Sequence, residues 1–253
     1  LALTLLMPMV TEAKMVAYSV GTDYGTAVDT SIDATNATSA YYGTGLYSAY
    51  YNTKPTYQYL RGNNPHTNKP RLESNIVFLS GHGNYDRLVF NYLGKGGDYA
   101  TGVYSEKNTT LNNYYKVAGL KSYNMNNVGM IIFAACLTGK EGVRNIADTA
   151  VLQGATVSIG WRQSIEAPSH TLWLNRFNKA LAKGKTLWDA VQEAGKYSYD
   201  DNAVKDMSIY GDFNNYKITN TYTTATINTL NHSENNTSES LKDYDVSIIF
   251  END

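Results

Sequence analysis

The chain is short of cysteine and of charge, and each shortage excludes a class of protein. It holds one cysteine, Cys136, in 253 residues. An internal disulfide framework and a cysteine-based zinc site are therefore excluded, because both need further thiols. Charged residues make up 17% of the chain, and the formal net charge is −2. Nucleic acids and charged membrane surfaces normally bind a basic patch, so neither is expected as a partner.

Long hydrophobic runs and clustered metal ligands are also lacking. The apolar stretch 1–10 is too short for a transmembrane helix, and no other stretch is long enough to span a bilayer. Residues 1–10 are either the remnant of a secretory signal or a packed part of the fold. The four histidines lie far apart in the sequence, which predicts no metal site.

The composition that remains favours a secreted or surface-attached bacterial protein. Tyr and Gly are abundant, with 22 and 20 residues, whereas Lys and Glu are few. The first residue is Leu1 rather than Met, which indicates a processed product or a piece of a longer protein. Other domains of such a precursor are among the expected partners.

Short apolar runs predict the strands of a sheet. Three strong runs, rich in Val and Ile and without polar alternation, are typical of buried parallel strands. These are residues 15–20 (MVAYSV), 75–80 (NIVFLS) and 128–134 (VGMIIFA). Residues 155–160 and 207–210 are weaker candidates.

Helical periodicity lies between these runs. The predicted helices cover residues 31–42, 141–153, 168–183 and 186–197. Gly154 and Gly184 are expected to end two of them, Thr186 to cap the last, and Pro168 to occupy a first turn. Alternating strands and helices predict a doubly wound α/β sheet. His170, at a helix start, and His66 and His232, in polar loops, are expected to be solvated.

Two segments depart from this alternation. Residues 84–127 are polar and rich in Tyr, Gly and Asn, and we interpret them as an insertion between two strands. This insertion is a substrate-binding flap, an autoinhibitory loop or a plain surface loop. Residues 214–253 are rich in Thr and Asn and predict a β-hairpin with strands at 222–230 and 244–250. They form either a terminal extension or the start of a further module.

Reactive side chains follow two of the strongest predicted strands. The run 75–80 continues into Gly81-His82-Gly83, and the run 128–134 continues into Ala135-Cys136. Because ligand sites of parallel sheets lie at the carboxyl ends of the strands, an imidazole and a thiol are expected side by side if the strands are neighbours. Such a pair is a nucleophile with its base. Taken alone, a cysteine after an apolar strand is most often a small buried hydrophobe.

These blocks resemble the caspase-like cysteine peptidases, a superfamily that includes caspases, gingipain, clostripain and CHAT-type domains. The resemblance is carried by IVFLSGHG at 76–83 and MIIFAAC at 130–136, with further similarity at 18–25, 173–194 and 208–212. It implies a mostly parallel, caspase-like α/β sheet flanked by helices. The implied peptidase domain is 1–213, followed by a β-rich extension at 214–253.

The resemblance also implies an activity, that of a cysteine endopeptidase acting on a protein or peptide substrate without a cofactor. His82 would be the general base and Cys136 the nucleophile, and the N–H groups of Gly83 and Cys136 would stabilise the oxyanion. The substrate-binding positions would be Asp23, Ala134, Trp161, Arg162 and Gln163. Asp23 in the pocket would select a basic side chain, whereas Arg162 would select an acidic one. The alternative is a catalytically silent caspase-like module, structural or protein-binding, within a larger surface protein.

Overall fold

The computed structural model describes residues 15–24, 28–55, 57–64, 68–90, 102–105 and 117–218. A six-stranded sheet in the order β10-β9-β8-β3-β1-β2 lies at its centre. Neighbouring strands are parallel except β10, which runs antiparallel to β9. The strands are β1 (Met15–Val20), β2 (Tyr47–Asn52), β3 (Ile76–Ser80), β8 (Met130–Ala134), β9 (Val157–Trp161) and β10 (Met207–Gly211). The predicted, mostly parallel α/β sheet is confirmed, and β2 is a strand that the sequence analysis missed.

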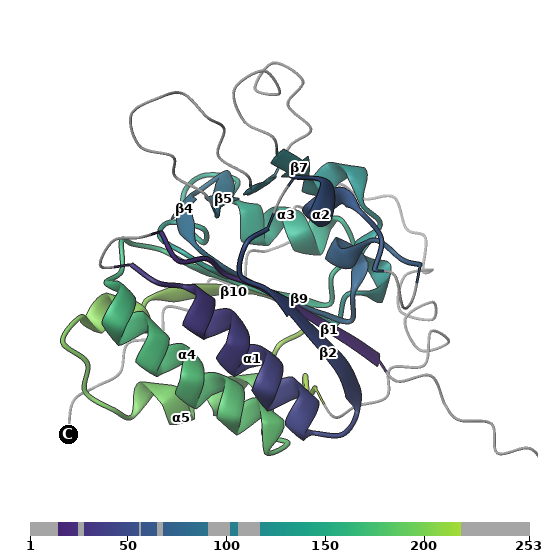
Figure 1. The fold of residues 1–253 in the computed structure, drawn as a ribbon. Helices are drawn as coiled ribbons and strands as arrows, with labels where there is room; N and C mark the ends of the chain where they lie inside the picture. Colours follow the sequence, from purple (N-terminus) through teal and green to yellow (C-terminus); the bar gives the residue numbers. More distant parts are fainter. Residues whose placement is uncertain are drawn as a thin grey trace, which may run out of the picture.

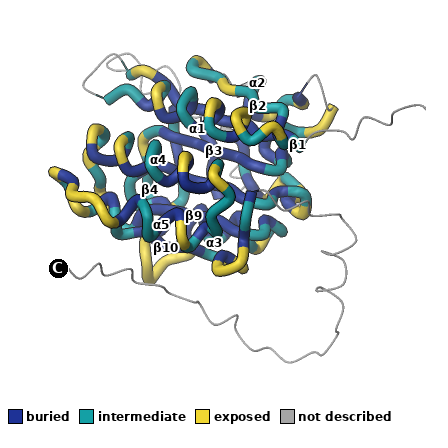
Figure 2. The backbone as a smooth tube through the Cα atoms, turned by 90° about the horizontal axis from the view of Figure 1, so that it is seen from below, coloured by how far each residue is buried: buried dark blue, intermediate teal, exposed yellow. Residues whose placement is uncertain are grey.

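Helices cover both faces of this sheet (Figure 1). One face carries α1 (Ser31–Gly43), α4 (Ala167–Ala182) and α5 (Leu187–Gly195). The other carries α2 (Tyr57–Arg61) and α3 (Ile146–Leu152). Apart from the edge strand β2, the strands of the main sheet are buried along most of their length, while the helices show exposed turns on their outer sides (Figure 2).

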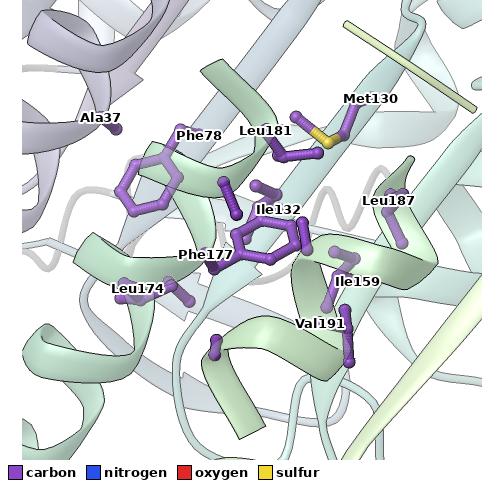
Figure 3. Packing of buried hydrophobic residues seen from close by; sticks show 14 of the residues in the cluster. Ala37, Phe78, Met130, Ile132, Ile159, Leu174, Phe177, Leu181, Leu187 and Val191 are labelled. Atoms are coloured by element: carbon purple, nitrogen blue, oxygen red, sulfur yellow. The ribbon is translucent and has the colours of Figure 1, made fainter. Parts of the chain in front are cut away.

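The larger core lies between the sheet and the three-helix face. Phe78, Ile132 and Ile159 of the sheet pack with Phe177 of α4 and Val191 of α5 (Figure 3). Continuous apolar strands are what a sheet with two covered faces requires, because each face needs its own apolar layer. A second core on the opposite face includes residues of α2 and α3.

A second, four-stranded sheet begins directly after β3. It comprises β4 (His82–Asn84), β5 (Arg87–Val89), β6 (Gly102–Tyr104) and β7 (Val117–Gly119), in that order. Apart from the first two residues of β4, it falls within the predicted insertion 84–127, whose described residues are therefore partly ordered into a small sheet. Leu88 and Val103 are buried in the second core, so these residues are part of the packed domain. Residues 91–101 and 106–116 of the insertion lie outside the described residues.

Short 3₁₀ turns complete the described chain. They are η1 (Arg71–Glu73), η3 (Leu120–Ser122), η4 (Met125–Asn127) and η5 (Asn202–Lys205). After β10 the described chain continues to Ile218, which is buried, and the main-chain oxygen of Tyr216 accepts from the N–H of Leu187 at 2.8 Å. The predicted domain boundary at 213 stays a prediction. Residues 1–10, the two predicted C-terminal strands, His66 and His232 lie outside the described residues.

Several predicted helix signals are confirmed. Thr186 caps α5 by accepting from the N–H of Asp189, Pro168 lies in the first turn of α4, and Gly154 and Gly184 have positive φ. The predicted start of the 141–153 helix is wrong, because α3 begins at Ile146. The side chain of Asn145 accepts from the N–H of Asp148 there, and this cap fixes the first turn.

The predicted solvation of His170 is wrong. This residue is 4% exposed, and its ring meets the ring of Trp161 edge-on with a centroid distance of 4.3 Å. Together with Trp173, Leu174 and Phe177 it forms an i, i+3, i+4, i+7 stripe, so the helix turns its imidazole toward the sheet. Leu172 lies off this stripe and is 52% exposed.

Candidate active site

The carboxyl ends of β3 and β8 lie side by side. The two strands are parallel neighbours, with Ser80 opposite Ala134 at the last position of the ladder. The N–H of Gly81 then donates to the oxygen of Ala134 at 3.3 Å, so the strands stay together beyond their formal ends. Segments 81–83 and 135–136 therefore leave the sheet at the same edge, as expected for parallel neighbours.

Gly83 lies directly against the main chain of Cys136. A Cβ atom placed on Gly83 would stand 2.4 Å from the oxygen of Cys136 and 2.7 Å from the Cβ of Ala135. Such distances are shorter than any van der Waals contact, so no larger residue fits this position without displacing the main chain. Glycine thus brings the segment that carries His82 into contact with the segment that carries Cys136.

Cys136 sits in a tight turn between β8 and α3. Its sulfur accepts from the N–H of Ile165 at 3.4 Å, and the thiol faces the oxygen of the same residue at 3.7 Å. Leu137 takes a positive φ of 63° and donates its N–H to the oxygen of Gln163 at 3.1 Å. The hydroxyl of Thr138 donates to the oxygens of Phe133 and Ala135, both at 2.8 Å. The turn is therefore held in place on both sides of the partly buried thiol.

His82 opens β4 and is exposed to solvent on part of its surface. Its ring packs on the ring of Tyr24 with a centroid distance of 4.4 Å and an interplanar angle of 52°. Partial burial lowers the pKa of His82 below 6.5, because an imidazolium loses hydration there. The imidazole is therefore neutral at neutral pH, which is the form that accepts a proton.

The predicted substrate-binding residues lie in three places. Ala134 and Trp161 have side chains in the larger core, where the indole N–H of Trp161 donates to the oxygen of Val204 at 2.9 Å. Asp23 follows β1, is exposed, and forms a bridge with Asp29 through the main chain. Arg162 and Gln163 follow β9, next to the turn that holds Cys136.

Arg162 is engaged by several polar groups. Its guanidinium lies 2.6 Å from a carboxylate oxygen of Glu141 and 3.7 Å from one of Asp206, and its Nε donates to the hydroxyl of Ser208 at 3.0 Å. The side chain is 9% exposed. Its charge is therefore largely compensated within the protein. The side-chain amide of Gln163 also donates to Asp206.

Behind the strand ends lies a buried polar group that the sequence analysis missed. The hydroxyl of Ser80 donates to a carboxylate oxygen of Asp33 at 2.6 Å and lies 3.3 Å from the oxygen of Ala134. The hydroxyl of Thr30 donates to the oxygen of Ser80 at 2.9 Å. Burial raises the pKa of Asp33 from 3.8 to about 6, while hydrogen bonds from Ser80 and Thr171 oppose this shift. The available signal was Ser80 itself, a polar residue ending an apolar strand.

Metal and membrane features are absent from the described part of the chain. Within it, no three His, Cys, Asp or Glu side chains gather closely enough to hold a metal ion. None of its helices is long and apolar enough to cross a membrane.

Comparisons with known proteins identify the fold. No family model and no curated protein matches the sequence. Among solved structures, the Arg-specific cysteine proteinase gingipain R matches with a TM-score of 0.50 and 13% identity, over 80% of this chain and 46% of that one. A complex of the pro- and mature domains of RgpB from Porphyromonas gingivalis matches with a TM-score of 0.52 and 12% identity, over 81% and 48%. The chain thus has the caspase-like fold of gingipain and spans about half the length of those chains.

Proposed function

We propose that the chain is a cysteine endopeptidase with Cys136 as nucleophile and His82 as general base. The observation that carries the proposal is the contact of Gly83 with the main chain of Cys136, at the shared edge of β3 and β8. It places the residue after an imidazole against the residue that bears the thiol. A cysteine with a purely structural role does not require an imidazole-bearing segment beside it.

The proposed reaction follows from these groups. His82 removes the proton from the Cys136 thiol, and the sulfur attacks the carbonyl carbon of the scissile peptide bond. The N–H groups of Gly83 and Cys136 donate to the oxyanion of the tetrahedral intermediate. His82 then gives its proton to the leaving amine as the C–N bond breaks, and a thioester forms. Water activated by His82 hydrolyses the thioester, which restores the thiol.

The surroundings of the two groups suit this chemistry. Partial burial lowers the pKa of His82, so the base is unprotonated at neutral pH. The N–H of Ile165 points to the sulfur at 3.4 Å, which holds the thiol in a fixed position at the turn. In the resting protein the Cys136 thiol faces a main-chain oxygen. In the proposed reaction, the thiol proton moves to His82 once substrate has entered.

We further propose that the enzyme prefers a basic residue before the scissile bond, with Asp23 as the selecting carboxylate. Asp23 is exposed on the loop after β1. The side chain of Arg162 is 9% exposed and lies beside the carboxylates of Glu141 and Asp206. A compensated cation attracts an acidic side chain weakly, because its field is already screened by its partners. Gingipain R, one of the structural neighbours, is an Arg-specific cysteine proteinase. Trp161 and Ala134 would support the pocket from below, and Gln163 would line its rim.

A library of peptides that differ in the residue before the scissile bond tests both proposals. Wild type is expected to cleave after Arg and Lys, and Cys136→Ala and His82→Ala are expected to abolish cleavage. Asp23→Asn should reduce the preference for basic residues, while Asp212→Asn, an exposed carboxylate after β10, serves as the matched control. Cleavage that survives Cys136→Ala would overturn the mechanism. A wild type that cleaves no peptide would instead favour the silent binding or structural module.

For the location of the protein we propose secretion or attachment to the bacterial cell surface. The composition supports this proposal, since Tyr and Gly are abundant and charged residues make up only 17% of the chain. Fractionation of the source cells, followed by immunoblotting of medium, surface and cytoplasmic fractions, tests it. Recovery in the cytoplasmic fraction alone would contradict it.

A further inference from the structure

We propose that Tyr24 is a positioning residue for His82, which it holds through both its hydroxyl and its ring. The proposal rests on the proposed function, because it assigns a role toward the general base of that reaction. Tyr24 stands on the loop after β1, 58 residues before His82. It lies in the segment 18–25 that carries part of the resemblance, but no motif assigns it a role toward His82.

The hydroxyl of Tyr24 bridges two main-chain groups at the start of the β4–β5 hairpin. It accepts from the N–H of His82 at 3.1 Å and donates to the oxygen of Val89 at 2.6 Å. His82 and Val89 face each other in the β4–β5 ladder. One oxygen atom thus ties the main chain of His82 to the strand opposite it.

The ring of Tyr24 supplies the second contact. It packs on the imidazole of His82 with centroids 4.4 Å apart. A ring in this position lies against one face of the imidazole and removes water from it. The partial burial that lowers the pKa of His82 therefore comes in part from Tyr24.

Tyr24 is itself held firmly. A Cβ atom placed on Gly81 would stand 2.8 Å from the Tyr24 hydroxyl and 2.5 Å from the oxygen of Val89, so the hydroxyl reaches its partners only because residue 81 is glycine. The N–H of Tyr24 donates to the oxygen of Val28 at 3.3 Å, and Thr30 ties the same loop to Ser80. Burial raises the pKa of Tyr24, so its hydroxyl keeps the proton that it donates to Val89.

Two substitutions separate the contributions of hydroxyl and ring. Tyr24→Phe keeps the ring and removes the bridge, whereas Tyr24→Leu removes both. Tyr197→Leu is the matched control, because this tyrosine is also partly exposed and its ring lies over Arg176 on the α4 side of the sheet. Circular dichroism and thermal unfolding confirm that each variant is folded before any other measurement.

The first measurement is the pKa of the His82 imidazole, followed by NMR and assigned with His82→Gln. We expect the pKa to rise toward 6.5 in Tyr24→Leu, since the imidazole regains water, and to stay unchanged in Tyr197→Leu. This measurement needs no substrate, so it tests the position of Tyr24 even if wild type cleaves no peptide. A folded Tyr24→Leu with an unchanged His82 pKa would overturn the proposal.

The second measurement is the pH profile of peptide cleavage. Loss of the bridge in Tyr24→Phe is expected to lower kcat about tenfold, the equivalent of one hydrogen bond, with KM within about twofold of wild type. In Tyr24→Leu the acidic limb of the kcat/KM profile should also move to higher pH. Tyr24 variants with wild-type kcat and an unmoved acidic limb would refute the role. Absence of cleavage by wild type would count against the proposed function alone.

Discussion

The buried carboxyl of Asp33 predicts an unusual dependence of stability on pH. Asp33 lies in the first turn of α1, is 3% exposed, and has a pKa raised by burial from 3.8 to about 6. Between pH 4 and pH 6 the folded protein keeps the proton on Asp33, whereas the unfolded chain has released it. The unfolded state then binds fewer protons, so the free energy of unfolding falls as pH rises through this window.

The size of this contribution follows from the two pKa values. Raising a carboxyl pKa from 3.8 to about 6 costs the folded state about 3 kcal/mol at neutral pH. Asp33→Asn cannot ionise, and its side chain still offers an oxygen to the hydroxyl of Ser80. We therefore expect Asp33→Asn to match wild type at pH 4 within about 1 kcal/mol and to be about 3 kcal/mol more stable at pH 7.

Urea unfolding followed by tryptophan fluorescence at pH 4, 5, 6 and 7 measures this difference. Asp189→Asn is the matched control, since Asp189 also lies in the first turn of a helix, α5, but is exposed. The difference in free energy of unfolding between Asp189→Asn and wild type should change little from pH 4 to pH 7. A stability difference for Asp33→Asn that stays flat from pH 4 to pH 7, or that turns destabilising as pH rises, would refute the reasoning.

Three further predictions concern packing. Gly83→Ala brings a Cβ within 2.4 Å of the Cys136 oxygen, so urea unfolding should show a loss of about 1–3 kcal/mol, together with lost cleavage; unchanged values would contradict that contact. Burial lowers the pKa of His170 to about 3, so proton binding favours the unfolded wild type as pH falls. The stability of His170→Phe relative to wild type should therefore rise from pH 7 to pH 4, and a stability difference that does not change with pH would argue against this. Phe177→Ala should lower the free energy of unfolding by about 3–5 kcal/mol in the same assay. A loss under about 1 kcal/mol would mean that neighbouring side chains move to fill the cavity.

The main sheet could be predicted from sequence because its strands are buried on both faces. Runs such as 76–80 and 130–134 are apolar at nearly every position. A half-buried strand or an amphipathic helix would carry polar residues at regular intervals, so such runs indicate buried strands. β2, with the sequence YSAYYN, was missed because it pairs only with β1 in the described sheet and is mostly half-buried. The three-residue strands β4 to β7 are too short to carry a periodic signal.

The candidate site was predictable only where it follows the strands. His82 and Cys136 directly continue β3 and β8, so a correct pairing of those strands brings their segments together. Tyr24 and Asp33 reach the same edge from a loop and a helix that precede β3 in the chain. Their contacts depend on how α1 and the loop after β1 pack, and local sequence patterns carry no information about that packing.

Specificity shows most clearly what a sequence leaves open. Asp23 and Arg162 are both charged residues after strands of the sheet, and the sequence favours neither as the selecting charge. In the structure, Arg162 has charged partners that are distant in the chain. Glu141 and Asp206 approach Arg162 from the turns before α3 and β10 and compensate its charge. If this compensation decides specificity, Glu141→Gln combined with Asp206→Asn should free Arg162 and raise the cleavage of peptides with an acidic residue before the scissile bond. Unchanged preference in this double variant would show that Arg162 does not contact the substrate.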